Sequence, residues 1–189
     1  MSNTVFFPDN ENFKNDGKIL VNKPIFENKI DITSSFSDDI SSKYLDELLL
    51  CGINRLSIGI QSFSEEDLTY MNRSHSAIQS HQAFKDIQGE GLKDYSSDLI
   101  YGGHPTTNDI WQENINIACS YYPTHISAYC MTIEPNTPFG QWNKKGTLTP
   151  IDEVKANQQF DLLISELSNH NYIHYEISNF ALKDHEALH

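Results

Sequence analysis

The chain has 189 residues, which is enough for one domain with a sizeable hydrophobic core. Its 26 acidic and 13 basic residues give a net charge of −13. This balance argues against a nucleic-acid or anionic-membrane partner, because no basic patch dominates. No apolar run approaches the ~20 residues of a membrane span, and the first residues lack the features of a signal peptide. We therefore expect a cytoplasmic protein without a membrane span.

Strands and helices alternate along most of the chain. Residues 1–29 are polar, and we expect an irregular N-terminal segment in which only residues 18–21 (KILV) resemble a strand. From residue 30 the elements repeat at about 30-residue spacing, the length of a βαβ unit. Strands are predicted near 30–33, 54–60, 95–100, 124–132 and 172–178. Helices are predicted near 41–51, around Leu68, near 76–88, near 107–120 and from residue 149 onward, with 134–149 as a long loop.

Two helix starts carry capping signals. Ser76 and Gln79 form a capping-box pattern. Thr149, Pro150 and Asp152 supply an N-cap, a first-turn proline and an acid, so we expect the last helix to begin there.

The alternation predicts an α/β fold, because strands separated by helices run parallel with right-handed crossovers. Two architectures fit, part of a (β/α) barrel and a doubly wound open sheet. In both, ligands bind at the carboxyl ends of the strands. No GxGxxG or Walker sequence follows any strand, which disfavours a nucleotide-binding open sheet. A partial barrel would leave an unpaired strand edge near residues 30–33.

Three polar residues of adjacent βα units form the candidate ligand site. Gln61 ends one strand, Arg73 lies on the connection that returns over it, and Asp98 lies within a run that otherwise reads as buried. A buried carboxylate is costly unless it is paired or hydrogen-bonded. An amide, a cation and an anion grouped at the carboxyl ends of the strands suit a zwitterionic ligand with hydroxyl groups. A simple ion pair between Arg73 and Asp98 explains the same residues about as well.

The cysteines and histidines give weaker signals. Cys51, Cys119 and Cys130 are widely spaced and odd in number, which predicts buried thiols and no disulfide framework. The first two end helices on the side opposite the ligand edge and the third lies within a strand, so we expect no iron–sulfur cluster on them. The histidines of HNYIH and HEALH invite a haem or metal hypothesis, but without a partner acid at metal-site spacing we favour surface histidines.

Five segments occur in the order and spacing of one protein family: GINRLSIGIQSF, MNRSH, DLIYG, HISAYCMTIEPNTPF and HYEISNFA. By these motifs the chain resembles the radical SAM proteins of the oxygen-independent coproporphyrinogen III oxidase type. The TIEPNTP and YEISNFA segments favour the haem-chaperone (HemW-type) branch of that family. The resemblance covers about residues 30–189.

The resemblance implies an incomplete, TIM-like (β/α) barrel over residues 30–189 that binds S-adenosylmethionine at its carboxyl edge. Gln61, Arg73, Asp98 and Thr132 match family positions around that ligand. The resemblance also implies a [4Fe–4S] cluster, haem or a porphyrin as a second ligand, and haem-acceptor proteins as partners.

The sequence departs from the family pattern at several points. It holds neither the CxxxCxxC loop that ligates the cluster nor the glycine-rich segment after it, and the C-terminal domain does not follow. Ser34 stands where the family has a glutamate, and residues 103–107 (GHPTT) replace an LPGQ-like turn. We therefore expect a truncated or degenerate copy, or a fragment of a longer product, that is not catalytic alone. The alternatives are an oxygen-independent coproporphyrinogen III dehydrogenase of porphyrin biosynthesis and a non-catalytic remnant.

Overall fold

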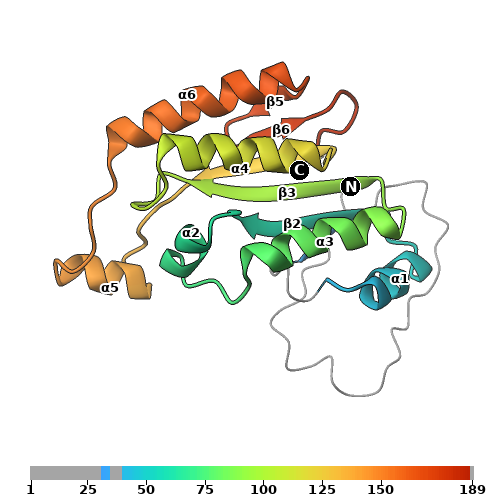
Figure 1. Cartoon of the computed structure of the whole chain (residues 1–189), viewed down its shortest axis with the longest axis horizontal. Coiled ribbons are helices and arrows are strands. Elements are labelled where there is room, and N and C mark those ends of the chain that lie inside the picture. Colours follow the sequence, from blue (N-terminus) through green and yellow to red (C-terminus); the bar gives the residue numbers. More distant parts are fainter. Residues whose placement is uncertain (1–30, 35–39, 188–189) are drawn as a thin grey trace, which may run out of the picture.

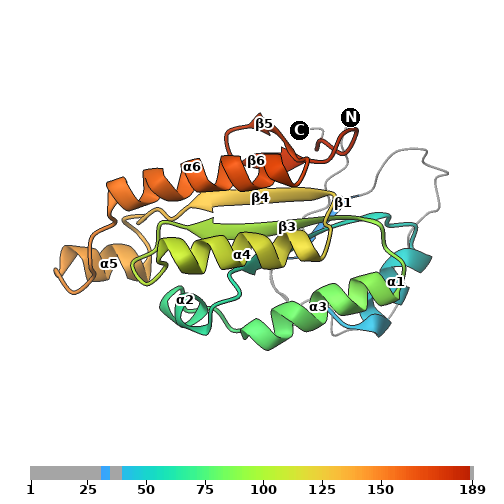
Figure 2. The same cartoon turned by 45° about the horizontal axis from the view of Figure 1, so that its top comes forward.

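The computed structural model describes residues 31–34 and 40–187. The expected irregular segment 1–29 lies outside the described residues. The described strands form one six-stranded sheet with the order β1-β2-β3-β4-β6-β5 (Figures 1 and 2). The strands are β1 Asp31–Ser34, β2 Arg55–Gln61, β3 Asp94–Tyr101, β4 His125–Cys130, β5 Ile173–Glu176 and β6 Asn179–Ala181.

The first four strands pair in parallel, each with the next along the chain, as the sequence predicted. β1 forms one edge of the sheet that the described residues build. The segment expected as one last strand is instead an antiparallel hairpin, β5–β6, and β6 pairs antiparallel with β4. A short connection between two strands allows only this antiparallel arrangement, whereas a parallel pair needs a crossover.

Six helices connect the described strands. They are α1 Ser42–Leu50, α2 Glu65–Tyr70, α3 Ala77–Gly89, α4 Asn108–Ser120, α5 Pro138–Lys144 and α6 Glu153–Asn169. Figures 1 and 2 show α3 and α4 running alongside β2 and β3, with α2 and α5 near each other at the carboxyl ends of these strands. None of the helices in the described ranges is long and apolar enough to cross a membrane.

The core lies between the sheet and the long helices. Leu56, Ile58 and Ile60 of β2 are fully buried and point toward this helix layer, which contributes Phe84 and Trp111 to the same cluster. Because side chains alternate along a strand, the intervening residues lie on the opposite face of the sheet. This opposite face carries Ser57, Ser96, Asp98, His125 and Ser127, and we call it the polar face.

Two helix predictions need correction. The last helix begins at Glu153, because Asp152 is the N-cap and accepts hydrogen bonds from the N–H groups of Val154 and Lys155; the start expected at Thr149 is therefore wrong. Helix α5 occupies part of the expected long loop, with Thr137 as its N-cap. The capping box at Ser76 is confirmed, since both reciprocal hydrogen bonds are present.

Candidate functional site

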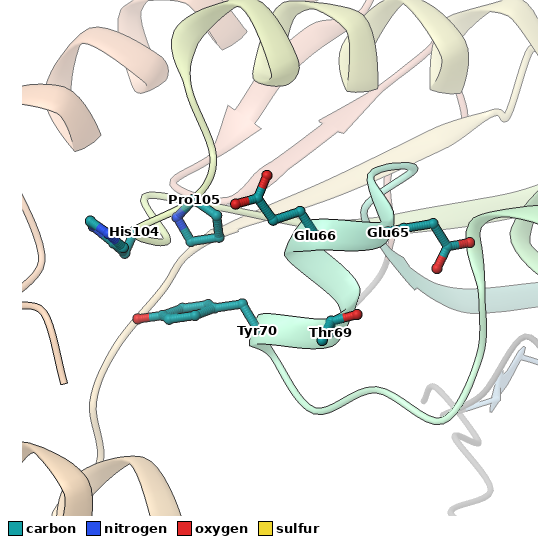
Figure 3. A pocket seen from close by; sticks show the side chains of 6 residues that line it. All are labelled: Glu65, Glu66, Thr69, Tyr70, His104 and Pro105. Atoms are coloured by element: carbon teal, nitrogen blue, oxygen red, sulfur yellow. The ribbon is translucent and has the colours of Figure 1, made fainter. Parts of the chain in front are cut away.

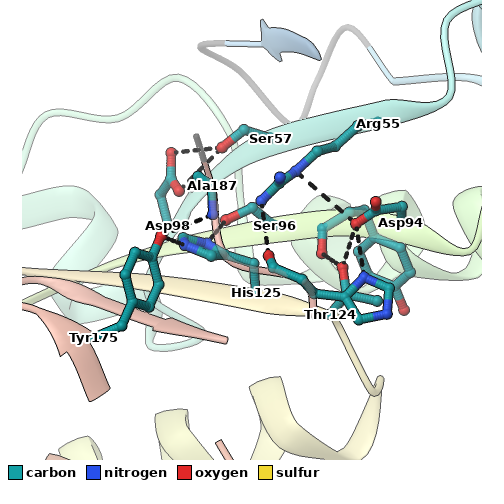
Figure 4. A network of polar contacts seen from close by, with 11 residues as sticks. Arg55, Ser57, Asp94, Ser96, Asp98, Thr124, His125, Tyr175 and Ala187 are labelled. Carbon is teal, nitrogen blue, oxygen red and sulfur yellow. Dashed lines mark hydrogen bonds and ion pairs between the residues drawn. The ribbon is translucent and has the colours of Figure 1, made fainter. Parts of the chain in front are cut away.

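Asp98 occupies the centre of the polar face. It lies on β3, opposite Gly59 of β2 on one side and Ser127 of β4 on the other. The Ser57 hydroxyl lies 3.1 and 3.2 Å from the two carboxylate oxygens of Asp98 and donates to them (Figure 4). Asp98 therefore points away from the helix layer, which is the orientation a ligand role requires.

Burial raises the pKa of Asp98 from 3.8 to about 6, and hydrogen bonds from Ser57, Ser127 and Ser96 oppose this rise. The carboxyl group is thus short of stabilising charge: three hydroxyls solvate it, and no described cation forms an ion pair with it. A group in this state gains from a ligand that supplies additional hydrogen-bond donors.

Gln61 is the last residue of β2 and is buried. Its φ of 65° lies in the left-handed region, and the pairing with β3 shifts register between Gly59 and Gln61. A non-glycine residue held in this conformation next to a bulge is strained, and such strain re-aims a side chain at the end of a strand. The conformation is consistent with a functional position for Gln61.

Arg73 lies on the connection between α2 and α3 and is partly buried. Its Nε is buried and has no hydrogen-bond partner among the described residues. Burial lowers the pKa of its guanidinium. No ion pair joins Arg73 to Asp98, so the simple pairing that the sequence left open is wrong. Arg73 thus keeps unused hydrogen-bonding capacity.

Thr132 is exposed and follows the last residue of β4, Cys130, by two positions. It therefore lies at the same carboxyl edge as Gln61. The structure places Gln61, Asp98 and Thr132 on or next to three neighbouring strands, with Arg73 on the connection after the first of them.

A buried network ties the connections at this edge to each other. Both carboxylate oxygens of Asp67 accept hydrogen bonds, one from Ser62 (2.7 Å) and one from Thr106 (2.8 Å). Asn114 of α4 donates to Ser62 at 2.9 Å and accepts from the N–H of Phe63 at 2.9 Å. The connection that begins at Gln61 is held in place by these contacts.

The neighbours of Asp98 on the polar face were not predicted from the sequence. His125 places Nδ1 2.7 Å from the Ser96 hydroxyl and Nε2 2.8 Å from the Tyr175 hydroxyl (Figure 4). Tyr175 also accepts a hydrogen bond from the N–H of Ala187 at 3.1 Å. The alternation of polar residues in YSSD and HISAY was the signal that could have revealed this row.

A second set of charges closes the amino end of the polar face. Arg55 is buried, its Nε lies 3.9 Å from Asp94 Oδ1, and its Nη2 donates to the backbone carbonyl of His185 at 3.4 Å. His185 Nδ1 lies 3.5 Å from the same Asp94 oxygen. The segment 182–187 is thereby held across this end, away from Gln61 and Thr132.

The cysteines do not fit an iron–sulfur cluster. Cys51 follows α1 and Cys119 lies near the end of α4, whereas Cys130 is exposed at the opposite, carboxyl end of β4. The prediction that Cys130 lies in a strand is confirmed, since it is the last residue of β4. The prediction of three buried thiols is wrong, since only Cys119 is buried. Burial raises the pKa of Cys119 to about 12, which disfavours the thiolate that ligates iron. The described residues contain no group of three His, Cys, Asp or Glu that could hold a metal ion.

The described histidines differ in burial, with His81 and His185 intermediate. His75 and His125 are buried, so the expectation of surface histidines is wrong for these two. His104, His170 and His174 are exposed. His189, in the HEALH segment, lies outside the described residues.

A separate open hollow of about 440 Å³ lies on the outer side of the carboxyl edge (Figure 3). Helix α2 and the connection between β3 and α4 form it. Its lining residues are Glu65, Glu66, Thr69, Tyr70, His104 and Pro105. None of the four predicted ligand residues lines this hollow, so it is distinct from the polar face.

Comparison with known proteins identifies the class and then the family. No protein-family model matches the chain. The solved structure of Escherichia coli coproporphyrinogen III oxidase (HemN), a radical SAM enzyme, matches with a TM-score of 0.71 at 23% sequence identity, covering 82% of this chain and 36% of that one. This likeness defines the fold as the partial, TIM-like barrel of radical SAM proteins, as the sequence predicted.

The sequence relatives are more specific. The chain is 32% identical to the haem chaperone HemW of Bacillus subtilis over 152 residues, which is 80% of this chain and 40% of that protein. It is 33% identical to HemW of Escherichia coli over 138 residues, covering 73% of this chain and 35% of that protein. The chain belongs to the HemW-like radical SAM family, and it spans about two-fifths or less of the length of these relatives.

Proposed function

We propose that the chain contributes the S-adenosylmethionine-binding edge of a HemW-like haem chaperone. The observation that carries this proposal is the Asp98 carboxyl, which faces away from the core, is solvated by serine hydroxyls and lacks a described cation. S-adenosylmethionine brings ribose hydroxyls, which donate hydrogen bonds, and a sulfonium cation. Both features suit an under-solvated carboxylate.

Each of the other three residues has a part in this binding proposal. Gln61 offers donor and acceptor groups to the adenosyl moiety from a re-aimed strand end. Arg73 retains an unpaired Nε that suits the ligand's carboxylate. Thr132 adds a hydroxyl at the end of the adjacent strand. S-adenosylmethionine supplies an alkylating or radical-forming sulfonium group, but the described residues do not fit a cluster, so the proposal concerns binding alone.

The binding role can be measured by calorimetric titration of the chain with S-adenosylmethionine. We expect Asp98→Ala to weaken binding by about 1.5–3 kcal/mol, roughly 10- to 150-fold, because one charge-assisted hydrogen bond is lost. Asp161→Ala, at an exposed position of α6, is the matched control and should bind like the wild type. Equal affinity of the Asp98→Ala variant and the wild type would refute the role of Asp98.

Haem is proposed as the second ligand because the named relatives are haem chaperones. Titration of the purified chain with haemin, followed by its Soret absorbance, tests this part. A coproporphyrinogen III dehydrogenase is the alternative, but only the fold likeness at 23% identity points to it. Porphyrinogen turnover without haemin binding would favour that enzyme over the chaperone.

A further inference from the structure

We propose that haem binds at the outer carboxyl edge, with His104 as an iron ligand and the porphyrin stacked on the aromatic rings beside it. The inference rests on the proposed haem-chaperone function and assigns that function a location. The rings belong to Tyr70, His104, Phe139 and Trp142, which we call the aromatic edge cluster.

The cluster joins three segments that are distant in sequence. The Tyr70 ring of α2 meets Phe139 of α5 edge-on, with their centroids 5.4 Å apart. The ring centroid of Phe139 lies 5.3 Å from that of Trp142 on the same helix. The ring centroid of Tyr70 lies 6.5 Å from that of the His104 imidazole. Figure 3 shows the Tyr70 ring lying below His104 at the open hollow. The four rings therefore form a contiguous cluster, with each neighbouring pair tilted by 52° to 78°, beside a space of ligand size.

Core packing does not explain this surface. The buried core between the sheet and the long helices includes none of these rings. Trp142 is 42% exposed, although it is one of only two tryptophans in the chain; the other, Trp111, is fully buried in the core. Large aromatic side chains that are grouped at the surface, outside the core, mark binding sites.

His104 is free to ligate iron. Its imidazole makes no hydrogen bond within the described part of the chain, whereas the imidazoles of His75, His81, His125 and His174 all do. Its backbone is held by two contacts: the carbonyl accepts a hydrogen bond from Lys155 Nζ at 3.0 Å, and a backbone hydrogen bond joins His104 to the Tyr70 hydroxyl. A fixed backbone with a free imidazole is what a single proximal ligand requires, since histidine is a common axial ligand of haem iron.

The local charges suit the two propionate carboxylates of haem. Lys144 and Lys145 end α5, next to Trp142, and the ammonium of Lys155 lies beside His104. Three of the 13 basic residues of this acidic chain thus gather around the cluster. Two acids on the lining, Glu65 and Glu66, oppose these cations. The Glu65 carboxylate accepts a hydrogen bond from the N–H of Ala77 at 2.7 Å, which directs it toward the start of α3.

The openness of the site agrees with a transfer role. A haem held in this shallow hollow leaves one face accessible, so an acceptor protein can contact the porphyrin before His104 releases the iron. A closed haem pocket would bind more tightly but would hinder such a transfer.

The test is titration with haemin of the wild type, His104→Ala and His170→Ala. His170 is the matched control, because it is also exposed, caps α6 and lies at the opposite end of that 17-residue helix from Lys155. We expect His104→Ala to shift the Soret band and to weaken binding at least about tenfold. His170→Ala should behave like the wild type.

A second arm separates stacking from ligation. We expect Trp142→Ala to weaken both haemin and iron-free protoporphyrin IX, whereas His104→Ala should weaken haemin alone. If the wild type binds haemin but His104→Ala and Trp142→Ala match it in spectrum and affinity, this location is wrong while the haem-chaperone proposal stands. If the wild type does not bind haemin at all, both proposals fall.

Discussion

The Asp98 carboxyl lies on the polar face among three serine hydroxyls, and burial raises its pKa from 3.8 to about 6. A raised pKa means that the folded chain binds the proton more tightly than the unfolded chain. Between pH 4 and pH 6 the folded state therefore holds more protons, and stability decreases as the pH rises through this window. The rise corresponds to at most about 3 kcal/mol that ionisation removes at neutral pH.

This decrease of stability with rising pH leads to a prediction for Asp98→Asn, because an asparagine keeps the shape of the aspartate side chain and cannot ionise. We expect the variant to be more stable than the wild type at pH 7.5, by up to about 3 kcal/mol, and equally stable near pH 4. Urea unfolding at the two pH values measures both differences. A variant less stable than the wild type at pH 7.5 would contradict the raised pKa.

At the scale of elements, helix α5 carries half of the aromatic edge cluster, and Gly140 lets it approach the preceding turn. A Cβ atom at residue 140 would clash with the carbonyl oxygen of Glu134 and would lie 2.6 Å from that of Pro135. Both obstacles are backbone atoms, which cannot rotate away. The position of α5 therefore depends on glycine at residue 140.

We expect Gly140→Ala to displace α5 and expose Trp142, with little effect on global stability, because α5 contributes nothing to the buried core. Acrylamide quenching of fluorescence reports on Trp142, since Trp111 is fully buried. Gly89→Ala is the matched control, because a Cβ there meets nothing within 4 Å. Quenching that is the same in Gly140→Ala as in the wild type would show that the turn adapts.

The same elements show what the sequence could and could not predict. The four parallel strands were predictable, because apolar runs such as LSIGI alternate with amphipathic helices. Helix α5 was not, since PFGQWNK is short and contains glycine, and its position depends on contact with Tyr70. The β5–β6 hairpin was also missed, because YIHYEIS reads as one strand and no glycine marks its turn.

The candidate site also has features that the sequence could predict and features that it could not. The placement of Asp98 on a strand was predictable, and the two-residue period of β3 explains why it faces away from the helices, because Leu99 next to it is apolar and buried. The unpaired state of Arg73 was not predictable, since Arg73 lies on a connection whose path depends on tertiary contacts. His104 gave no sequence signal at all, because its aromatic neighbours come from other segments.

At the scale of the whole molecule, the two ends of the sheet differ in chemistry. The carboxyl end presents residues with unused hydrogen-bonding capacity, whereas the amino end is closed by Arg55, Asp94 and the segment 182–187. The polar groups at the amino end are engaged with one another. In barrels of this type, ligands bind at the carboxyl face and the opposite face serves stability.

The division predicts that Arg55→Met lowers stability without changing ligand affinity. Removing Arg55 leaves the Asp94 carboxylate without its close cation and releases the carbonyl of His185, so we expect a loss of about 3–5 kcal/mol in urea unfolding. Lys43→Met, at an exposed position of α1, should stay within about 0.5 kcal/mol of the wild type.

The affinity of the folded Arg55→Met variant for S-adenosylmethionine should match the wild type within about twofold, because the lost contacts lie at the far end from Gln61 and Thr132. A loss below about 1 kcal/mol would contradict the stabilising role of Arg55, and a weakened affinity in the still-folded variant would show that the two ends of the sheet are coupled.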